Sequence, residues 1–143
     1  MLEKIILKNF QRHEHFELCL DPHVTVITGA SNRGKSSVFR AFRWISLNQT
    51  PRGVNYSRRK QENGCEVGLI LDKGIEIKRI KSKTKNEYIL NKSKYEVPGN
   101  NRPPEDIAKV LNVSSLNFSK QIDGPLWFTL TPGQVSKELP AIR

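Results

Sequence analysis

The stretch Gly29-Ala30-Ser31-Asn32-Arg33-Gly34-Lys35-Ser36 follows the pattern G-x-x-x-x-G-K-[ST], which is typical of loops that bind phosphate groups. Residues 24–28 come directly before it and are all β-branched, which predicts a strand buried on both faces of a sheet. Residues 35–47 come directly after it and predict a helix, whose apolar stripe is Val38, Phe39, Phe42, Trp44 and Ile45. This order of strand, glycine-bearing loop and helix predicts an α/β protein of the P-loop NTPase class.

Each residue type in this loop has a physical role in holding a nucleoside triphosphate. Glycines let backbone N–H groups turn toward the phosphates, and the N-terminus of the following helix adds partial positive charge. We expect Lys35 to reach the β- and γ-phosphates and the Ser36 hydroxyl to hold Mg²⁺. Ser37 is expected to cap or pack in the first helical turn, and Arg33 either contacts phosphate or faces solvent. The predicted cofactors are therefore ATP and Mg²⁺, held by Gly29, Ala30, Ser31, Asn32, Arg33, Gly34, Lys35, Ser36 and Ser37.

The rest of the chain consists mainly of predicted short strands with tight turns between them. Strands are predicted at 5–10, 15–20, 65–71, 74–80, 87–91 and 94–97, with a hairpin turn at Asp72-Lys73-Gly74. Short helices are predicted at 104–111 and 133–139, while 114–123 is either a strand or a short helix. Residues 48–63 are polar and basic, which indicates a surface excursion. The later strands predict an antiparallel β-subdomain beside the P-loop.

Charge is the main signal in the composition. The 143-residue chain has 24 Lys and Arg against 14 Asp and Glu, a formal net charge of +10. This surplus favours a polyanionic partner such as nucleic acid, although a merely soluble basic protein has the same balance.

No apolar run is long enough to span a membrane. Cys19 and Cys65 are expected to be buried free thiols in a reducing, cytosolic setting. His13 and His15 share one face of a strand, but no further ligand completes a metal site.

Positive charge is concentrated between residues 78 and 94, where Glu87 is the only acidic residue. On an extended strand Lys81, Lys83 and Lys85 would line one face, and such a row can bind a phosphate backbone without reading bases. Lysines also guard exposed strand edges against pairing, so a solvated hairpin edge is the alternative. The predicted DNA-binding residues are Lys78, Arg79, Lys81, Lys83 and Lys85.

Two segments carry a family resemblance. The first combines Ile6-Leu7-Lys8-Asn9-Phe10 with the run from Val24 to Trp44. It resembles the N-terminal half of the SMC/RecF/SbcC group of DNA-repair and chromosome-organising ATPases, relatives of the ABC ATPases, and is nearest to SbcC-like proteins of bacteriophages and their hosts. The second segment, residues 118–128 followed by Thr-Pro-Gly-Gln-Val at 131–135, looks like the Q-loop region of that group. The Q-loop glutamine of the family matches Gln121.

The resemblance implies an activity and a set of partners. In this family two heads enclose two ATP molecules, and hydrolysis releases the dimer and moves the attached arms on DNA. Lys35 and Gln121 would then be catalytic, Gln121 would share the Mg²⁺ with Ser36, and Arg12 would lie near the nucleotide. The implied partners are a second head or a C-terminal lobe, and DNA, with a nuclease subunit as a further possibility and no membrane. The implied setting is the cytoplasm of a bacterial or phage-infected cell, near the nucleoid.

Several motifs of that family are missing from this sequence. It has no apolar strand ending in Asp-Glu to supply a general base, and no Leu-Ser-Gly-Gly-type signature. We therefore expect one N-terminal lobe of an ATPase head, residues 1–143, which binds ATP but does not hydrolyse it alone. Within it, 1–48 hold the P-loop, 49–101 the basic loop and β-subdomain, and 102–143 the Q-loop region. The alternatives are a non-catalytic DNA- or protein-binding module that mimics or inhibits a head and, more weakly, a small-molecule P-loop kinase.

Overall fold

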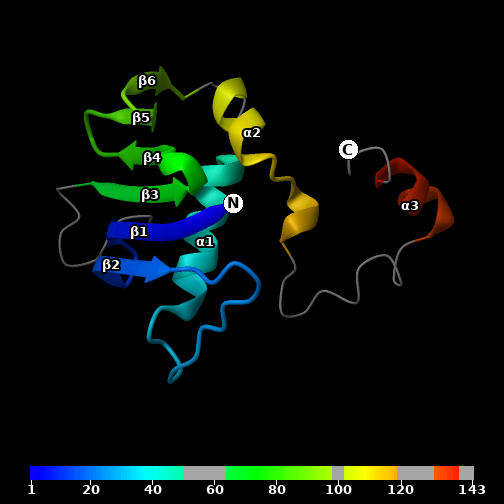
Figure 1. The fold of residues 1–143 in the computed structure, drawn as a ribbon, viewed down its shortest axis with the longest axis horizontal. Helices are drawn as coiled ribbons and strands as arrows, with labels where there is room; N and C mark the ends of the chain where they lie inside the picture. Colours follow the sequence, from blue (N-terminus) through cyan, green and yellow to red (C-terminus); the bar gives the residue numbers. More distant parts are fainter. Residues whose placement is uncertain (50–63, 98–101, 119–130, 139–143) are drawn as a thin grey trace. The chain divides into compact units, whose positions relative to one another are not determined.

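Strands with alternating apolar residues form a six-stranded antiparallel sheet in the first part of the chain (Figure 1). The computed structural model describes residues 1–49, 64–97, 102–118 and 131–138. The chain divides into two compact units, Met1–Leu111 and Asn112–Arg143, and each is described by itself. The strands, in the order β2-β1-β3-β4-β5-β6, are β1 (Leu2–Phe10), β2 (His13–Cys19), β3 (Cys65–Leu71), β4 (Glu76–Lys81), β5 (Asn86–Leu90) and β6 (Ser93–Glu96). β1 pairs with both β2 and β3, and the chain from β2 to β3 contains the glycine loop and the helix after it.

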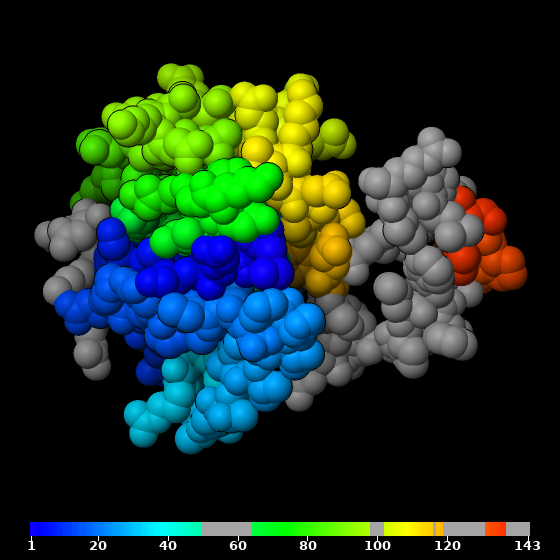
Figure 2. All heavy atoms as spheres, in the orientation of Figure 1, coloured from blue at the N-terminus to red at the C-terminus, as the bar shows by residue number. Residues whose placement is uncertain are grey.

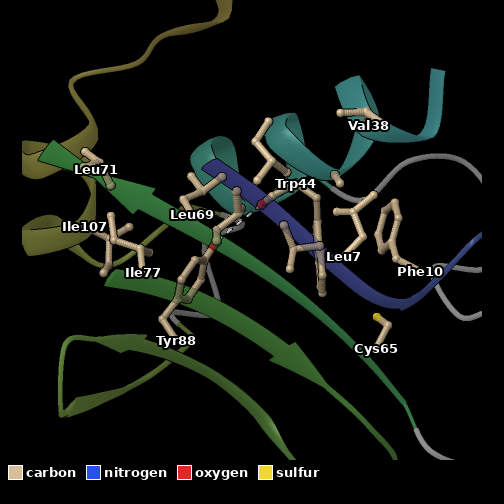
Figure 3. Packing of buried hydrophobic residues seen from close by; sticks show 14 residues of the cluster. Leu7, Phe10, Val38, Trp44, Cys65, Leu69, Leu71, Ile77, Tyr88 and Ile107 are labelled. Atoms are coloured by element: carbon tan, nitrogen blue, oxygen red, sulfur yellow. Dashed lines mark hydrogen bonds between the residues drawn. The ribbon is translucent and has the colours of Figure 1, made fainter. Parts of the chain in front are cut away.

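Helix α1 (Lys35–Leu47) packs on one face of this sheet and forms the core of the first unit with it (Figure 3). The rings of Phe10 and Trp44 stack with centroids 5.7 Å apart. The Tyr88 hydroxyl donates a hydrogen bond to the Trp44 carbonyl at 3.4 Å. Helix α2 (Glu105–Leu111) adds the buried Ile107. The other buried apolar residues are Ile5, Leu7, Val38, Ala41, Ile45, Cys65, Val67, Leu69, Leu71 and Ile77.

A charged residue, Arg79 of β4, also lies inside this core and is only 2% exposed. Its guanidinium carbon lies 4.8 Å from the centroid of the Trp44 ring and 4.7 Å from that of Tyr88, which is cation–π geometry with both rings. Burial raises the pKa of the Tyr88 hydroxyl, and Arg79 opposes this shift. The guanidinium donates hydrogen bonds to the carbonyls of Ile80 and Glu87 and to the side chains of Asn48 and Asn86. Arg79 thereby joins the C-terminal end of α1 to the β4–β5 hairpin.

Most of the predicted elements are confirmed. The predicted helix at 35–47 and strand at 65–71 have the same bounds in the structure, and the other confirmed strands differ by at most three residues at either end. The short helices are found at Glu105–Leu111 and, as α3, at Pro132–Glu138. The described part of 114–123 contains a 3-10 turn at Ser115–Asn117. The antiparallel β-subdomain is therefore as the sequence predicted.

The predicted strand at 24–28 is wrong. These residues form no strand. They belong to the long loop between the edge strand β2 and helix α1 (Figure 1). Val24 and Val26 are 71% and 75% exposed, and Phe39, predicted to belong to the apolar stripe of α1, is 60% exposed. The reason is that no strand in the described part of the chain pairs with this segment. Cys19 is exposed as well, so the expected burial holds for Cys65 alone.

The face of the sheet turned away from α1 is toward the viewer in Figure 2, and it carries paired charges. The pairs are Lys4 with Glu17 at 3.2 Å, Lys8 with Glu66 at 3.0 Å and Lys78 with Glu76 at 2.9 Å. Hydrogen bonds and charge from Lys4 lower the pKa of the Glu17 carboxyl. Because each of these lysines lies beside a carboxylate, this face is not uniformly basic.

The second unit is described at residues 112–118 and 131–138. Helix α3 begins with one half of a capping box, because the backbone N–H and hydroxyl of Thr131 donate to the Gln134 side-chain oxygen at 2.9 and 3.0 Å. Pro132 occupies the first helical position, where its missing N–H costs nothing. Over the residues that the structure describes, no helix is long and apolar enough to cross a membrane.

Candidate nucleotide-binding site

The loop between residues 28 and 35 has a backbone that few residue types accept. Gly29, Asn32 and Gly34 have φ angles of +141°, +61° and +97°, a region that favours glycine and tolerates asparagine. Gly34 is the N-cap of α1, and no side chain forms a capping hydrogen bond there. A Cβ added at Gly29 would meet nothing within 4 Å, so the space beside it is open. The start of α1 therefore offers N–H groups and a positive dipole end to an anion.

The Lys35 side chain lies across this loop. Its Nζ donates hydrogen bonds to the carbonyl oxygens of Gly29 at 2.7 Å and Ala30 at 2.9 Å. Two neutral carbonyls hold the ammonium in place without neutralising its charge. The ammonium can therefore exchange these oxygens for the charged oxygens of a phosphate, which are stronger acceptors.

The two serines after Lys35 differ in exposure. Ser36 is exposed, whereas Ser37 is 1% exposed. The Ser37 N–H donates to the Gly34 carbonyl at 2.9 Å, and its hydroxyl accepts a hydrogen bond from Arg40 at 3.4 Å. Ser37 therefore packs in the first helical turn, and the Ser36 hydroxyl is the one open to a metal ion. The other loop residues Ala30, Ser31, Asn32 and Arg33 are exposed.

The turn between β1 and β2 lies against the start of α1. Arg12 is exposed there, and its Cβ would lie 3.4 Å from a Cβ added at Gly34. The Gln11 side chain accepts a hydrogen bond from Arg40 of α1 at 2.8 Å. Arg12 is thus beside the glycine loop, and its contact with a nucleotide stays a prediction.

His13 is the residue that sequence reasoning missed. Its Nε2 lies 3.1 Å from the Gly34 carbonyl oxygen, whereas the sequence pattern raised only a metal site for this residue and offered no further ligand to complete it. Twenty-one positions separate the two residues, and no spacing rule connects them. The pairing of His13 with Phe10 across the β1–β2 hairpin brings the ring to the loop, and only the position of α1 over that sheet could have revealed it.

Two of the predicted DNA-binding residues lie on opposite faces of β4. Arg79 is buried between two aromatic rings, so its prediction as a DNA contact is wrong. Lys78 points to the other face and pairs with Glu76. The strand alternates its side chains between core and surface, and position 79 is one of the core positions together with Ile77.

The remaining three lysines lie around one hairpin tip. β4 ends at Lys81, and Lys83 and Lys85 follow in the exposed turn before β5, so they do not form the predicted row on one strand face. The Ser82 hydroxyl holds this turn by accepting the N–H groups of Thr84 at 3.2 Å and Lys85 at 2.9 Å. The positive charge is therefore gathered around an exposed turn rather than along one face of a strand.

Gln121 lies outside the described residues, and so does the basic stretch at 50–63. The metal and catalytic roles predicted for Gln121 stay predictions. In the described ranges, no group of three or more His, Cys, Asp or Glu side chains could hold a metal ion by itself. A metal held through Ser36 would need oxygens from a bound phosphate as well.

Comparison with known proteins identifies the family. The model of a family described as an AAA domain matches residues 4–127. The chain belongs to this AAA domain family. A curated relative, the DNA double-strand break repair Rad50 ATPase of Saccharolobus solfataricus, is 35% identical over 95 residues. That match covers 63% of this chain and 11% of the relative, so the chain spans a small part of the Rad50 length.

Solved structures share the fold of this AAA domain protein. One, from work on ATP-driven dimerization and DNA-stimulated activation of SMC ATPases, has a TM-score of 0.66 at 16% identity and covers 99% of both chains. Another, the recombination mediator RecF with ATP, has a TM-score of 0.60 at 21% identity and covers 71% of this chain and 30% of RecF. The predicted fold class and the resemblance to the N-terminal part of SMC/RecF/SbcC-type ATPase heads are confirmed. A particular nearness to phage proteins stays a prediction.

Proposed function

We propose that this chain is the ATP- and Mg²⁺-binding part of an SMC/Rad50-type ATPase head that acts on DNA in repair or recombination. The observation that carries the proposal is the placement of the Lys35 ammonium across the glycine loop at the start of α1. An ammonium and a helix N-terminus placed in this way can bind a triphosphate together. The Rad50 ATPase relative and the structure of RecF with ATP support ATP as the nucleotide.

The residues of the loop fit this ligand. The open space beside Gly29 leaves room for phosphate oxygens, and Lys35 would exchange its two carbonyl partners for the β- and γ-phosphates. Ser36 would hold Mg²⁺ through its exposed hydroxyl, and Arg12 would add positive charge from the β1–β2 turn. Gln121 would meet the metal and the attacking water, as the family resemblance implies. Bound ATP would supply the phosphate bond whose hydrolysis drives the head.

The apolar segment at 24–28 marks where a second lobe would complete the head. Val24, Val26 and Phe39 are large apolar side chains that stay more than half exposed. Packing of a further lobe would bury these side chains, and the β-branched Val24 and Val26 suit a strand that pairs with neighbours in a sheet. The Rad50 relative and RecF are much longer than their matched parts and have sequence enough to supply such strands. The proposed partner is this second lobe or a second head, and nucleotide-driven dimerisation of heads would follow from it.

The tip of the β4–β5 hairpin is the proposed DNA contact. Lys81, Lys83 and Lys85 lie around one turn whose shape is fixed by the Ser82 hydroxyl. Ammonium groups on an exposed turn can contact a phosphate backbone without reading base sequence. The lysines on the outer face of the sheet are less suited, because carboxylates offset them.

Nucleotide affinity tests the ATP site. A fluorescent ATP analogue titrated into the full chain with Mg²⁺ should saturate, and Lys35→Ala should weaken binding about tenfold or more, since hydrogen bonds to charged groups contribute about 1.5–3 kcal/mol. Lys109→Ala is the matched control, because that lysine is exposed on α2 and lies 3.9 Å from Glu105. No binding by the unchanged chain, or equal binding by Lys35→Ala, would contradict the site.

Turnover tests the enzymatic part of the proposal. The sequence has no Asp-Glu pair after an apolar strand to act as general base, so the 143-residue chain should hydrolyse negligible ATP by itself. A phosphate-release assay with saturating Mg²⁺ and ATP measures this. Robust turnover would show that the chain holds its own base and needs no second lobe.

Salt dependence tests the DNA contact. Replacing Lys81, Lys83 and Lys85 with Glu should weaken binding to duplex DNA and flatten the plot of log affinity against log salt by roughly 3 in slope. The control replaces the exposed Lys73, Lys92 and Lys109 with Glu, which changes the net charge equally. An unchanged slope in the hairpin variant, or an equal loss in the control, would reject the hairpin tip as the DNA site.

A further inference from the structure

His13, the first residue of β2, lies against the N-cap of α1. Its Nε2 lies 3.1 Å from the Gly34 carbonyl oxygen, and its ring packs on Phe16 with centroids 4.6 Å apart. A Cβ added at Gly34 would lie 2.7 Å from the His13 Nε2 and 2.9 Å from its Cε1. The imidazole therefore occupies the space that a side chain at position 34 would need. Glycine at this position therefore has two reasons: its φ of +97° is in the left-handed region, and a larger residue would clash with His13.

We propose that His13 is a positioning residue for the phosphate-binding loop, a role that rests on the nucleotide binding proposed above. A carbonyl oxygen only accepts hydrogen bonds, so the His13 Nε2 carries a hydrogen and donates it to Gly34. The peptide unit is planar and trans, so the Gly34 carbonyl and the Lys35 N–H point in opposite directions. By holding the carbonyl toward β2, His13 directs the Lys35 N–H away from β2, to the side from which an anion can reach the helix N-terminus.

Further hydrogen bonds hold the same hairpin turn on the same helix. Arg40 of α1 donates to Gln11 at 2.8 Å and to the Ser37 hydroxyl at 3.4 Å. The Ser37 N–H also donates to the Gly34 carbonyl at 2.9 Å, so this oxygen accepts both from the helix and from His13. A carbonyl oxygen has two lone pairs, and both are used here. Ser37 bonds to this peptide unit, which carries the Lys35 N–H, from within α1, and His13 bonds to it from β2.

Nucleotide affinity separates positioning from packing. His13→Phe keeps a ring against Phe16 but removes the donor, and His13→Gln keeps a donor near the place of Nε2. We expect the affinity for the Mg²⁺-bound fluorescent ATP analogue to fall about tenfold in His13→Phe and to stay within about twofold in His13→Gln. His15→Phe is the control, since His15 lies on the same strand, is exposed and bonds only to Glu17 among the contacts described for it, at 3.2 Å.

The outcomes distinguish this inference from the proposed function. If the unchanged chain binds no nucleotide, the proposed function fails. If it binds and His13→Phe binds equally well, or if His13→Gln is as weak as His13→Phe, the positioning role is overturned. Circular dichroism and thermal unfolding check that every variant is folded.

Nitrogen-15 NMR of the histidine rings tests the hydrogen bond without nucleotide and without a variant. We expect the neutral His13 ring to carry its hydrogen on Nε2, and this hydrogen to exchange with water more slowly than the ring hydrogens of His15 and His23. A bare Nε2 in His13, or exchange as fast as in His15, would overturn the proposal because the bond to Gly34 would then not exist. This measurement keeps the inference falsifiable even where His13→Phe fails to fold.

Discussion

β3 and the segment at 24–28 are two short apolar runs with opposite surroundings. Val67 of β3 is 0% exposed, whereas Val26 is 75% exposed. β3 pairs with β1 on one side and with β4 on the other, and α1 packs on it. The segment at 24–28 pairs with no strand in the described ranges. The same side chain is therefore buried or exposed according to its neighbours, and an apolar run indicates only that a segment needs a partner.

The largest expected effect concerns Arg79, a charged side chain that is buried in the core, whereas the two valines compared above are apolar. Arg79→Ala should lower the free energy of unfolding by about 3 kcal/mol or more, because it removes two cation–π contacts and leaves buried polar partners unsatisfied. Lys78 lies one position earlier, on the outer face of the sheet. Lys78→Ala should lower the free energy of unfolding by less than about 1 kcal/mol, because it removes only an exposed ion pair. Urea unfolding of both variants measures the difference. Similar losses of unfolding free energy in the two variants would show that burial of Arg79 among its partners contributes little to stability.

The next test applies one substitution to both apolar runs. Val67→Ala should cost about 2 kcal/mol, since it removes two buried methyl groups and leaves a cavity. Val26→Ala should change the free energy of unfolding by less than about 0.5 kcal/mol, because the side chain is already in water. Urea unfolding at one pH is again the measurement. A loss at Val26 as large as that at Val67 would mean that the segment at 24–28 is buried in solution.

The local part of the fold could be predicted because it depends on neighbours in sequence. The bounds of α1 follow from the glycine before Lys35 and from helical spacing of apolar residues up to Leu47. The bounds of β3 follow from a mainly apolar run between Gly64 and Asp72, in which Glu66 is the one charged residue. Periodicity also places Arg79 on the same face as Ile77, whereas its positive charge groups it with the neighbouring surface lysines.

The remaining errors concern contacts between distant segments. The sequence around Val26 does not indicate whether another strand lies beside this segment, so the exposure of the Val26 side chain could not be predicted. Nothing links His13 to Gly34 before the β1–β2 hairpin is placed under α1. The loop residues around Lys35 were found because the motif is local, and the residue that supports the loop was missed because its contact is tertiary.

The smallest effect concerns the thiol of Cys65 at the start of β3. Burial raises the pKa of this thiol from 9.0 to about 12, against the opposing charges of Arg79 and Lys81. The unfolded chain therefore loses the proton first as the pH rises, and the contribution of the protonated thiol to stability is full below pH 9 and is lost between pH 9 and 12. At pH 10 the unchanged chain should have lost about 1.4 kcal/mol relative to a Cys65→Ala variant, each compared with its own stability at pH 7.

Unfolding at both pH values measures this difference, and Tyr88 titrates in both proteins, so its effect cancels. Cys19 gives the contrast, because its thiol is exposed on β2. Cys19→Ala should therefore leave the pH dependence unchanged. An equal pH dependence in the unchanged chain and in Cys65→Ala would show that water reaches the start of β3. In that event β3 would resemble the segment at 24–28 at this end, and the contrast between the two runs would be limited to the centre of the strand.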